Sequence, residues 1–263
     1  MTDTPRRRAL VTGSSSGIGR GMAHRLAREG FDLVLVARRA PMLEELAREI
    51  GPAAKVEIVP ADLCDRDAPA RIAEAVGPRG VDVLVNNAGG GWIGAFDGAP
   101  LARQLEIVDL NVRALVELTH RVLPGMKERR WGRIAQVASV AGFLPGPLAS
   151  VYYASKAFVV SHSEALRHEL AGTGVSISLV CPGPVATEFQ RSSGVRGNVG
   201  DRVSMSAEAV AEAAVDGLLA QRFLVVPGAS NAAVVALSRI VPNRLLASLV
   251  SRMQERRLRD AGA

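Results

Sequence analysis

Two patterns of apolar residues alternate along the chain. Short, nearly continuous aliphatic runs are separated by longer segments in which apolar residues recur every three or four positions. A short continuous run is typical of a strand buried on both faces, whereas the recurring pattern is typical of a helix with one buried face. The runs predict strands at residues 9–11, 31–36, 56–59, 81–85, 132–138, 175–180 and 223–226.

Helical segments stand between these strands. Apolar spacing and Gly or Pro breaks predict helices ending near residue 30, at residues 42–50 and 68–76, within 101–129, and at 152–171 and 207–220. Strands that alternate with helices form a parallel sheet, because right-handed crossovers place the helices on both of its faces. The predicted fold class is therefore α/β, a Rossmann-like doubly wound parallel sheet of about seven strands, with ligands at the carboxyl ends of those strands.

Chain length and the last segment set the domain organisation. A chain of 263 residues suffices for one sizeable domain, which we expect over residues 1–227. Residues 228–263 are expected to form a C-terminal helical extension, since residues 232–259 alternate apolar side chains with arginines around Pro242. We expect the extension to pack on the domain or at an oligomer contact, and attachment to a membrane surface is the alternative.

The formal charge of +6 comes almost entirely from arginine, because Lys55, Lys127 and Lys156 are the only lysines. The arginines are scattered among acidic residues instead of clustering, so we expect no nucleic-acid partner. A basic surface of this kind attracts phosphorylated cofactors and anionic substrates. Two cysteines, Cys64 and Cys181, are too few and too far apart to predict a disulfide framework or a metal site.

No targeting or membrane segment is evident in the chain. Arg6, Arg7 and Arg8 are followed by an apolar run that stops at Thr12 and Gly13, far short of a signal-peptide core. No stretch reaches the roughly eighteen uninterrupted apolar residues of a membrane span. We therefore expect a cytoplasmic protein.

A glycine-rich turn lies between the first strand and the first helix, with the sequence Thr12-Gly13-Ser14-Ser15-Ser16-Gly17-Ile18-Gly19. Glycines at such a turn let backbone amides approach a pyrophosphate, and the helix N-terminus adds its partial positive charge. The spacing differs from the dinucleotide fingerprint Gly-x-Gly-x-x-Gly. Position at the start of a βαβ unit is what favours a phosphate site.

Several motifs occur in order at compatible intervals. After the glycine turn come Asn86-Asn87-Ala88-Gly89 behind the fourth strand, Tyr152-x-x-x-Lys156, and Pro182-Gly183 with Thr187 four residues on. Together they resemble the short-chain dehydrogenase/reductase family over about Arg8 to Pro227. The resemblance implies hydride transfer between a nicotinamide cofactor and a carbonyl or alcohol. It also implies a homodimer or homotetramer formed through helices within residues 101–129 and 152–171.

Tyr152 and Lys156 make chemical sense without the family. A phenol with a pKa of about 10 needs a nearby cation to act in acid–base catalysis at neutral pH. Lys156 is four residues from Tyr152, and residues at that spacing share a helix face. Tyr153, three residues from Lys156, also fits this geometry, and it is the resemblance that selects Tyr152.

The resemblance implies further roles. Ser139 is expected to hydrogen-bond the substrate oxygen as charge develops there. Lys156 is expected to hold the nicotinamide ribose, and Asn111 to support a water beside it. The predicted catalytic residues are Asn111, Ser139, Tyr152 and Lys156.

Cofactor choice depends on the end of the second strand. An acidic residue there binds the ribose 2′-hydroxyl of NAD, whereas an arginine accommodates a 2′-phosphate. Arg38 and Arg39 follow that strand, so NADP(H) is preferred and NAD(H) is possible; the alternative is that both arginines begin a solvated helix. Asp62 resembles an adenine contact but could equally cap a helix. Predicted cofactor contacts are Gly13, Ser15, Ser16, Gly17, Ile18, Gly19, Arg38, Arg39, Asp62, Leu63, Asn87, Ala88, Gly89, Tyr152, Lys156, Pro182, Gly183, Val185 and Thr187.

The substrate side is predicted only in outline. Residues 91–93, residues 143–145 and Phe189 are apolar loop segments that either line a pocket for an apolar carbonyl or alcohol substrate or anchor the loops. Residues 192–204 match the family's mobile substrate loop and are a candidate lid. Two other functions stay open, an NAD(H)-dependent alcohol dehydrogenase on the same site and a nonenzymatic dinucleotide-binding sensor.

Overall fold

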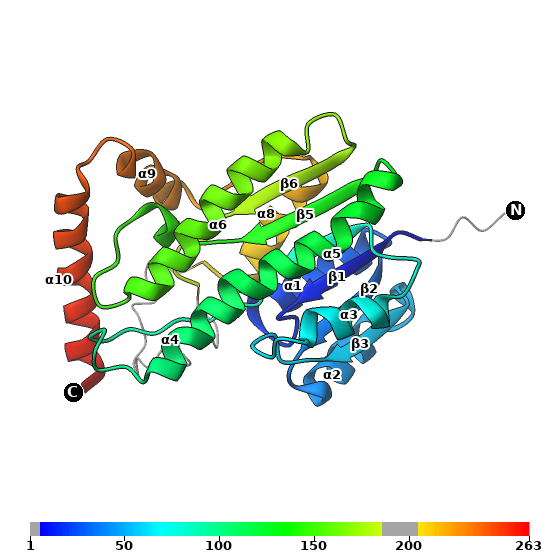
Figure 1. The fold of residues 1–263 in the computed structure, drawn as a ribbon, viewed down its shortest axis with the longest axis horizontal. Coiled ribbons are helices and arrows are strands. Elements are labelled where there is room, and N and C mark those ends of the chain that lie inside the picture. Colours follow the sequence, from blue (N-terminus) through cyan, green and yellow to red (C-terminus); the bar gives the residue numbers. More distant parts are fainter. Residues whose placement is uncertain (1–5, 186–204, 263) are drawn as a thin grey trace, which may run out of the picture.

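A computed structural model describes residues 6–185 and 205–262. Its centre is a seven-stranded sheet in which every neighbouring pair of strands is parallel (Figure 1). The strands are β1 (Arg8–Thr12), β2 (Asp32–Ala37), β3 (Val56–Pro60), β4 (Val83–Asn86), β5 (Gly132–Val137), β6 (Val175–Val180) and β7 (Leu224–Val225).

The strand order is β3-β2-β1-β4-β5-β6-β7, so the order reverses between β1 and β4. Leu10 of β1 is paired with Val34 on one side and with Leu84 on the other. In a doubly wound sheet the reversal point opens a crevice at the carboxyl ends of the strands. The predicted fold class is confirmed.

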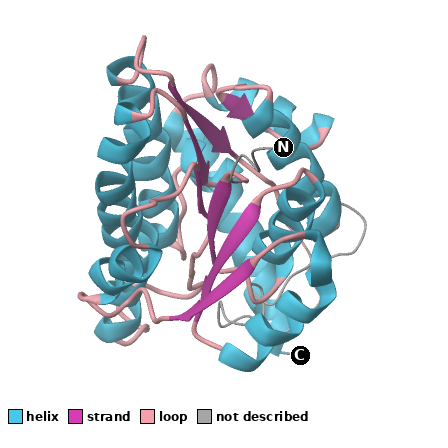
Figure 2. Cartoon of the chain, turned by 90° about the vertical axis from the view of Figure 1, so that its right-hand side faces the viewer, coloured by secondary structure: helices cyan, strands magenta, loops and turns pink. Residues whose placement is uncertain are grey.

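Helices cover both faces of the sheet, as Figure 2 shows with the sheet between two helical layers. Met22 and Leu26 pack on one face together with Ala211 and Val215. Ile72 and Leu118 pack on the other face. The helices that connect the strands are α1 (Gly17–Arg28), α2 (Ala40–Ile50), α3 (Ala68–Val76), α4 (Leu101–Val108), α5 (Ala114–Glu128), α6 (Ser150–Glu169) and α8 (Ala207–Leu219).

Burial explains why the central strands read as continuous apolar runs. Every residue of β1, β2, β4 and β5 is buried, because helices cover both sides of each of these strands. At the edge of the sheet, none of the five residues of β3 is fully buried, and Glu57 and Pro60 are exposed. The predicted strands therefore match those observed within one or two residues at their ends.

The long helix expected within residues 101–129 is interrupted. A π-helical segment, Asp109–Arg113, stands between α4 and α5. Pro124 lies inside α5. A π segment widens the helix by about one residue per turn, and such segments are frequent at functional sites.

The chain ends in two helices, α9 (Ala229–Ser238) and α10 (Asn243–Gly262). Figure 1 shows α10 beyond the carboxyl end of the sheet. Val250 of α10 packs in a cluster with Ala141, Ala149 and Tyr153. The predictions for Thr187, Phe189 and residues 192–204 lie outside the described residues.

Candidate active site

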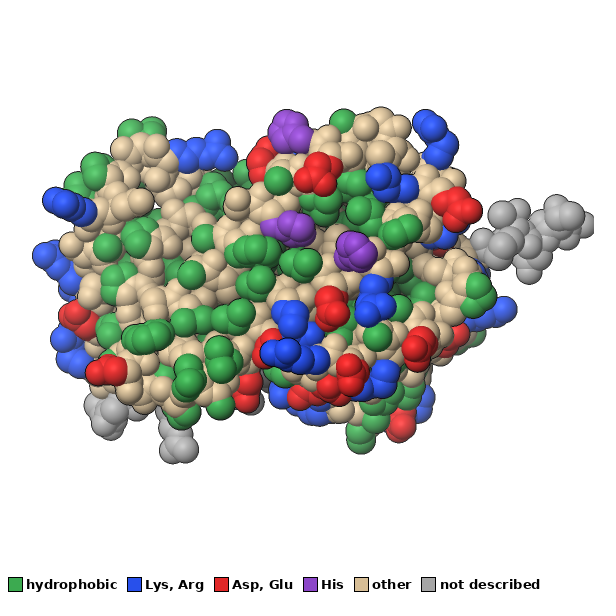
Figure 3. Space-filling model, viewed as in Figure 1, with side chains coloured by type: hydrophobic (Ala, Val, Ile, Leu, Met, Phe, Trp, Pro, Cys, Tyr) green, Lys and Arg blue, Asp and Glu red, His purple; other side chains and the backbone are tan. Residues whose placement is uncertain are grey.

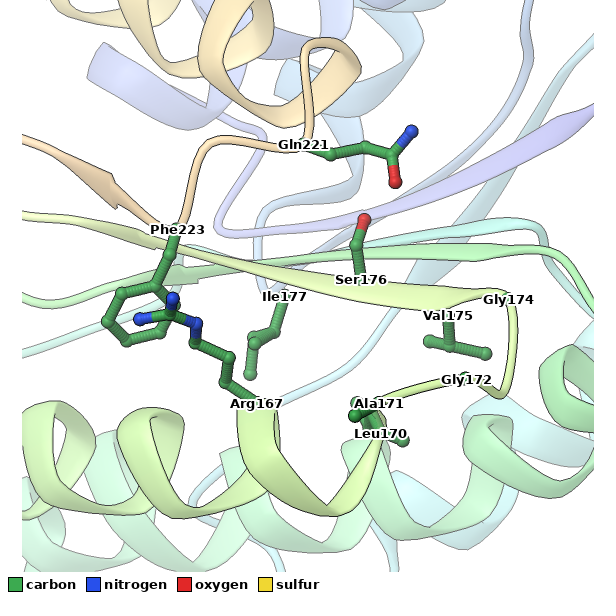
Figure 4. Close-up of a pocket in the computed structure, with 10 residues that line it drawn as sticks. All are labelled: Arg167, Leu170, Ala171, Gly172, Gly174, Val175, Ser176, Ile177, Gln221 and Phe223. Atoms are coloured by element: carbon green, nitrogen blue, oxygen red, sulfur yellow. The ribbon is translucent and has the colours of Figure 1, made fainter.

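A large cavity lies at the carboxyl ends of the strands. It has a volume of about 740 Å³ and extends from Arg38 to Lys156 and on to Arg257. A smaller hollow of about 370 Å³ lies at the amino ends of β6 and β7, where the Arg167 guanidinium covers the ring of Phe223 (Figure 4). Ligands of doubly wound sheets bind at the carboxyl ends, so the larger cavity is the candidate site.

One end of this cavity is shaped by the turn between β1 and α1. The hydroxyl of Thr12 accepts hydrogen bonds from the backbone N–H groups of Asn87 and Ala88, both at 3.0 Å. The Asn87 side chain in turn donates to the Thr12 carbonyl at 2.9 Å. These bonds join the loops that follow β1 and β4, the two strands on either side of the topological reversal.

Two glycines of this turn are required by close approach. A Cβ atom on Gly13, whose φ is +65°, would lie 2.8 Å from Asn87 Nδ2 and 2.9 Å from the Cα of Ala88. A Cβ on Gly19 would overlap the Gly13 carbonyl and the Asn87 side chain. Larger residues at either position would displace the turn, because backbone atoms cannot move aside as a flexible side chain can.

The N-terminus of α1 suits a phosphate group. Ser16 holds the N-cap position without making a side-chain cap, and no acidic residue lies in the first turn. The first N–H groups of a helix have no partner within the helix and carry partial positive charge. Ser15, Ser16, Gly17 and Ile18 all line the cavity, so this helix end fits the pyrophosphate of a dinucleotide.

Arg38 and Arg39 line the same end of the cavity. Arg39 donates to the Ser15 hydroxyl at 3.1 Å. Arg38 is 73% exposed and lies 4.0 Å from Asp62, which also lines the cavity. A guanidinium so exposed can reach a phosphate with little desolvation cost.

Lys156 lies on α6 and is almost completely buried. Its ammonium group donates to the carbonyl of Val137, at the end of β5, at 2.9 Å. Burial lowers the pKa of Lys156 from 10.5 to about 8, because water no longer solvates the charged form. A pKa near 8 still leaves the ammonium mostly protonated at neutral pH.

The two tyrosines of α6 have different partners. Burial raises the pKa of Tyr152 to about 12, and a hydrogen bond with Ser139 opposes that rise. The Tyr153 hydroxyl accepts instead from the Gln254 amide of α10 at 3.3 Å. The two rings meet edge to face with centroids 5.8 Å apart. Of the two tyrosines, it is therefore Tyr152 whose hydroxyl is hydrogen-bonded to Ser139.

Ser139 follows β5 and begins a short 3₁₀ helix, Val140–Phe143. Its hydroxyl accepts from the N–H of Ala141 at 3.1 Å and donates to the Pro182 carbonyl at 3.4 Å. Gly142 is pressed against the backbone of α6 at Lys156, so this short helix and α6 lie in direct contact. The contact brings Ser139, Tyr152 and Lys156 to one wall of the cavity.

Asn111 lies in the π segment and is 1% exposed. Its amide donates to the Gly90 carbonyl and to the Ser155 hydroxyl, and its oxygen accepts from the Gly90 N–H, each at 2.9 Å. Ser155 in turn donates to the carbonyl of Tyr152 at 2.7 Å. Asn111 thus joins the loop after β4 to α6, and its predicted support of a water stays a prediction.

Most predicted site residues line the one cavity. Asn111 and Gly19 do not line it and lie behind its wall, and Thr187 is outside the described residues. The predicted residues that line it are Gly13, Ser15, Ser16, Gly17, Ile18, Arg38, Arg39, Asp62, Leu63, Asn87, Ala88, Gly89, Ser139, Tyr152, Lys156, Pro182, Gly183 and Val185.

Sequence reasoning missed the part of the wall that comes from the C-terminal helices. These residues are Ser230, Asn231, Val234, Met253, Gln254 and Arg257. Gly183 approaches the Asn231 side chain so closely that a Cβ there would overlap it. No local signal marked these residues, since nothing in the sequence around Gln254 links it to Tyr153.

The described residues offer neither a metal site nor a membrane-spanning helix. No group of three or more His, Cys, Asp or Glu side chains there is arranged to hold a metal ion. In the same part of the chain, no helix combines the length and apolarity needed to cross a bilayer. Cys64 and Cys181 are both free thiols.

Known proteins resemble this chain in sequence. Residues 7–196 match the family model described as short chain dehydrogenase. A ketoacyl reductase from Nostoc sp. is 39% identical over 71% of this chain and 66% of its own length. Sulfoacetaldehyde reductase 2 from Chromohalobacter salexigens is 40% identical over 68% of this chain and 73% of its own length.

Solved structures resemble the fold. A short-chain dehydrogenase from Sphingobium yanoikuyae in complex with NADPH aligns with a TM-score of 0.80 at 31% identity, over 90% of this chain and 96% of its own. A short-chain dehydrogenase/reductase from Burkholderia phymatum in complex with NAD aligns with a TM-score of 0.79 at 28% identity, over 90% of this chain and 94% of its own.

Proposed function

The chain belongs to the short-chain dehydrogenase/reductase family, and from this we propose that it is an NADP(H)-dependent oxidoreductase that interconverts a ketone or aldehyde and its alcohol. One observation carries the proposal. Ser139, Tyr152 and Lys156 line the same cavity as the uncapped N-terminus of α1. A phosphate-binding helix end and an acid–base pair in one cavity match a cofactor-dependent transfer.

The residues have distinct tasks in this proposal. The nicotinamide cofactor, when bound, supplies or accepts the hydride. Ser139 donates a hydrogen bond to the substrate oxygen, and Tyr152 gives it a proton during reduction. A Tyr152 pKa of about 12 keeps the phenol protonated in the ligand-free protein, as donation requires. The Lys156 ammonium stabilises the phenolate that remains.

Substituting each tyrosine tests the acid assignment. Tyr152→Phe removes the proton donor, and we expect kcat to fall by at least about 100-fold. Tyr153→Phe removes only the hydroxyl that Gln254 contacts, and we expect it to retain most turnover of uncharged ketones. Steady-state kinetics with NADPH over a panel of carbonyls measures both. Loss of turnover in Tyr153→Phe alone would reverse the assignment.

NADP(H) preference is the finer part of the proposal, and Arg38 supports it. An exposed guanidinium at the end of β2 can form a charge-assisted hydrogen bond to a 2′-phosphate that NAD(H) lacks. Arg38→Ala should lower the ratio of kcat/KM for NADPH to that for NADH by about 10-fold or more. Arg48→Ala is the control, because Arg48 is an exposed arginine of α2 that does not line the cavity, and it should leave this ratio unchanged. A wild-type ratio below one would favour the NAD(H)-dependent alternative.

The substrate is proposed as a small carbonyl or alcohol with an apolar body. Trp92, Ile93, Leu144, Val234 and Met253 line the cavity beyond the catalytic wall. Burial of apolar substrate surface against such side chains stabilises the complex. Reduction of ketones and aldehydes is also the activity that the names of the ketoacyl reductase and sulfoacetaldehyde reductase relatives state for those proteins.

A further inference from the structure

Helix α10 closes the substrate end of the cavity. Met253, Gln254 and Arg257 all line it, and Arg257 shares a helix face with the other two because it follows Met253 by four residues and Gln254 by three. Figure 1 shows α10 across the end of the sheet toward which the strands run. The residues that approach a substrate from this side therefore come from outside the βα repeat.

Charge is distributed unequally along the cavity. Among the residues that the structure describes, its charged lining residues are Arg38, Arg39, Asp62, Lys156 and Arg257. The single acid among them, Asp62, lies beside Arg38 at the cofactor end. Within the described part of the chain Arg257 has no ion pair, although it is half-buried. A half-buried cation in a cavity wall without a neighbouring carboxylate attracts an anionic ligand.

Gln254 has one half of its amide without a partner. The side chain is 1% exposed and its nitrogen donates to the Tyr153 hydroxyl at 3.3 Å, whereas its oxygen has no hydrogen-bond partner among the described residues. A phenol hydroxyl both donates and accepts, so a rotated amide could accept from Tyr153 and offer its NH₂ group instead. Either way, one polar end remains for a ligand, because buried polar groups are normally hydrogen-bonded.

Gln254 and Arg257 can be placed relative to the proposed proton donor, Tyr152, through the neighbouring Tyr153. Gln254 contacts Tyr153, and the Tyr153 ring packs against the ring of Tyr152 with centroids 5.8 Å apart. Burial raises the pKa of the Tyr153 hydroxyl, and Arg257 lies near enough for its positive charge to oppose that rise. Arg257 and Gln254 thus stand about one aromatic ring beyond the catalytic wall.

We propose that Arg257 and Gln254 form a subsite for a carboxylate, so that the substrate is an oxo acid whose acid group lies at the far end from its carbonyl. This inference rests on the proposed function and adds a substrate class to it. A guanidinium and an amide NH₂ together match the two oxygens of a carboxylate. The apolar lining from Trp92 to Met253 then holds the hydrocarbon between the two groups.

Matched substrates test the subsite. Levulinate and its longer straight-chain homologues are compared with their methyl esters in NADPH-dependent reduction, which varies length and charge separately. We expect the best acid to have a higher kcat/KM than its ester in the wild type. Arg257→Leu should lower kcat/KM for that acid by about 10- to 100-fold and change the ester by no more than about twofold.

Three further variants keep the test independent of folding defects. Arg256→Leu removes the adjacent, exposed arginine that does not line the cavity and should change neither substrate. Arg257→Lys retains the charge and should restore part of the preference for the acid. Gln254→Glu places a carboxylate in the subsite and should lower the acid's kcat/KM more than the ester's.

The possible failures are distinguishable. Equal effects of Arg257→Leu on acid and ester, or a wild-type preference for every ester, would overturn the subsite and leave the oxidoreductase proposal standing. If no compound is reduced, calorimetric titration of levulinate homologues into the NADP⁺-loaded protein decides. Binding that disappears in Arg257→Leu would support the subsite without the reaction, and binding that persists in that variant, or none at all, would refute it.

Discussion

Burial sets the protonation state of the two central residues of the site. Lys156 contacts the Val137 carbonyl and has a pKa of about 8, whereas Tyr152 has a pKa of about 12. Both shifts disfavour the charged form, because the groups have left water. In the ligand-free protein, therefore, the Tyr152 phenol loses its proton less readily than it would in water, and the Lys156 ammonium loses its proton more readily.

The Lys156 shift predicts a pH dependence of stability. Between pH 8 and 10.5 the unfolded chain keeps the proton that folded Lys156 has lost, so the unfolded state binds more protons. The free energy of unfolding contributed by this group therefore rises with pH through that window, by at most about 3 kcal/mol. Urea denaturation of ligand-free wild type and Lys156→Met should show the difference between them moving in favour of the wild type as pH increases. A constant difference would mean that Lys156 titrates normally.

At the scale of an element, the π segment positions the loop after β4. Asn111 spans from this segment to Gly90 and to Ser155 of α6 with all of its amide groups engaged. A regular α-helix would turn the side chain at this position by roughly 100° per residue inserted or removed, away from those partners. The distortion is thus what lets one side chain join three parts of the site.

Removing that side chain should cost more than removing its neighbour. Asn111→Ala leaves the Gly90 N–H and carbonyl without their partner, and we expect the free energy of unfolding to fall by about 2–4 kcal/mol. Val112→Ala, in the same segment without polar contacts, should lower it by no more than about 1 kcal/mol. Thermal or urea unfolding measures both. Equal losses would show that the Asn111 hydrogen bonds contribute little.

At the scale of the whole molecule, apolar side chains gather on one face. Figure 3 shows hydrophobic atoms over α4 and α6, where Leu101, Leu105, Val108 and Phe158 are between 40% and 70% exposed. Such a patch on two adjoining helices is typical of an interface between subunits. We propose that a second copy of the chain covers this face, which agrees with the oligomer that the family resemblance implies.

A charge placed on the patch should separate the subunits. Leu105→Arg would bury an unpaired arginine from each copy in the apolar interface, which would destabilise the oligomer. Light scattering after gel filtration should therefore give a lower mass than for the wild type. Leu249→Arg, on α10 and 60% exposed, is the matched control and should leave the mass unchanged. A lower mass for Leu249→Arg alone would move the interface to the C-terminal helices.

Local and periodic features of the sequence were enough for the fold and for much of the site. Alternating apolar patterns determine the strands and helices, and the handedness of the crossovers then leaves few ways to arrange them. The glycine turn, Ser139 and the Tyr152–Lys156 spacing stand at the carboxyl edge for the same reason. Each depends on residues close together in the chain or on the direction of a parallel strand.

Contacts between distant segments were decided only by the tertiary structure. Gln254 contacts Tyr153, which is 101 positions away in the sequence. This contact gives Tyr153 a different partner from Tyr152 and accompanies the packing of α10 in the cavity wall. The same holds for Asn111, whose partners lie on two other elements. Such contacts arise from how helices pack at the sheet edge, and no spacing along the chain encodes them. The candidate catalytic residues could therefore be picked out from the sequence, whereas the shape and charge of the far end of the cavity could not.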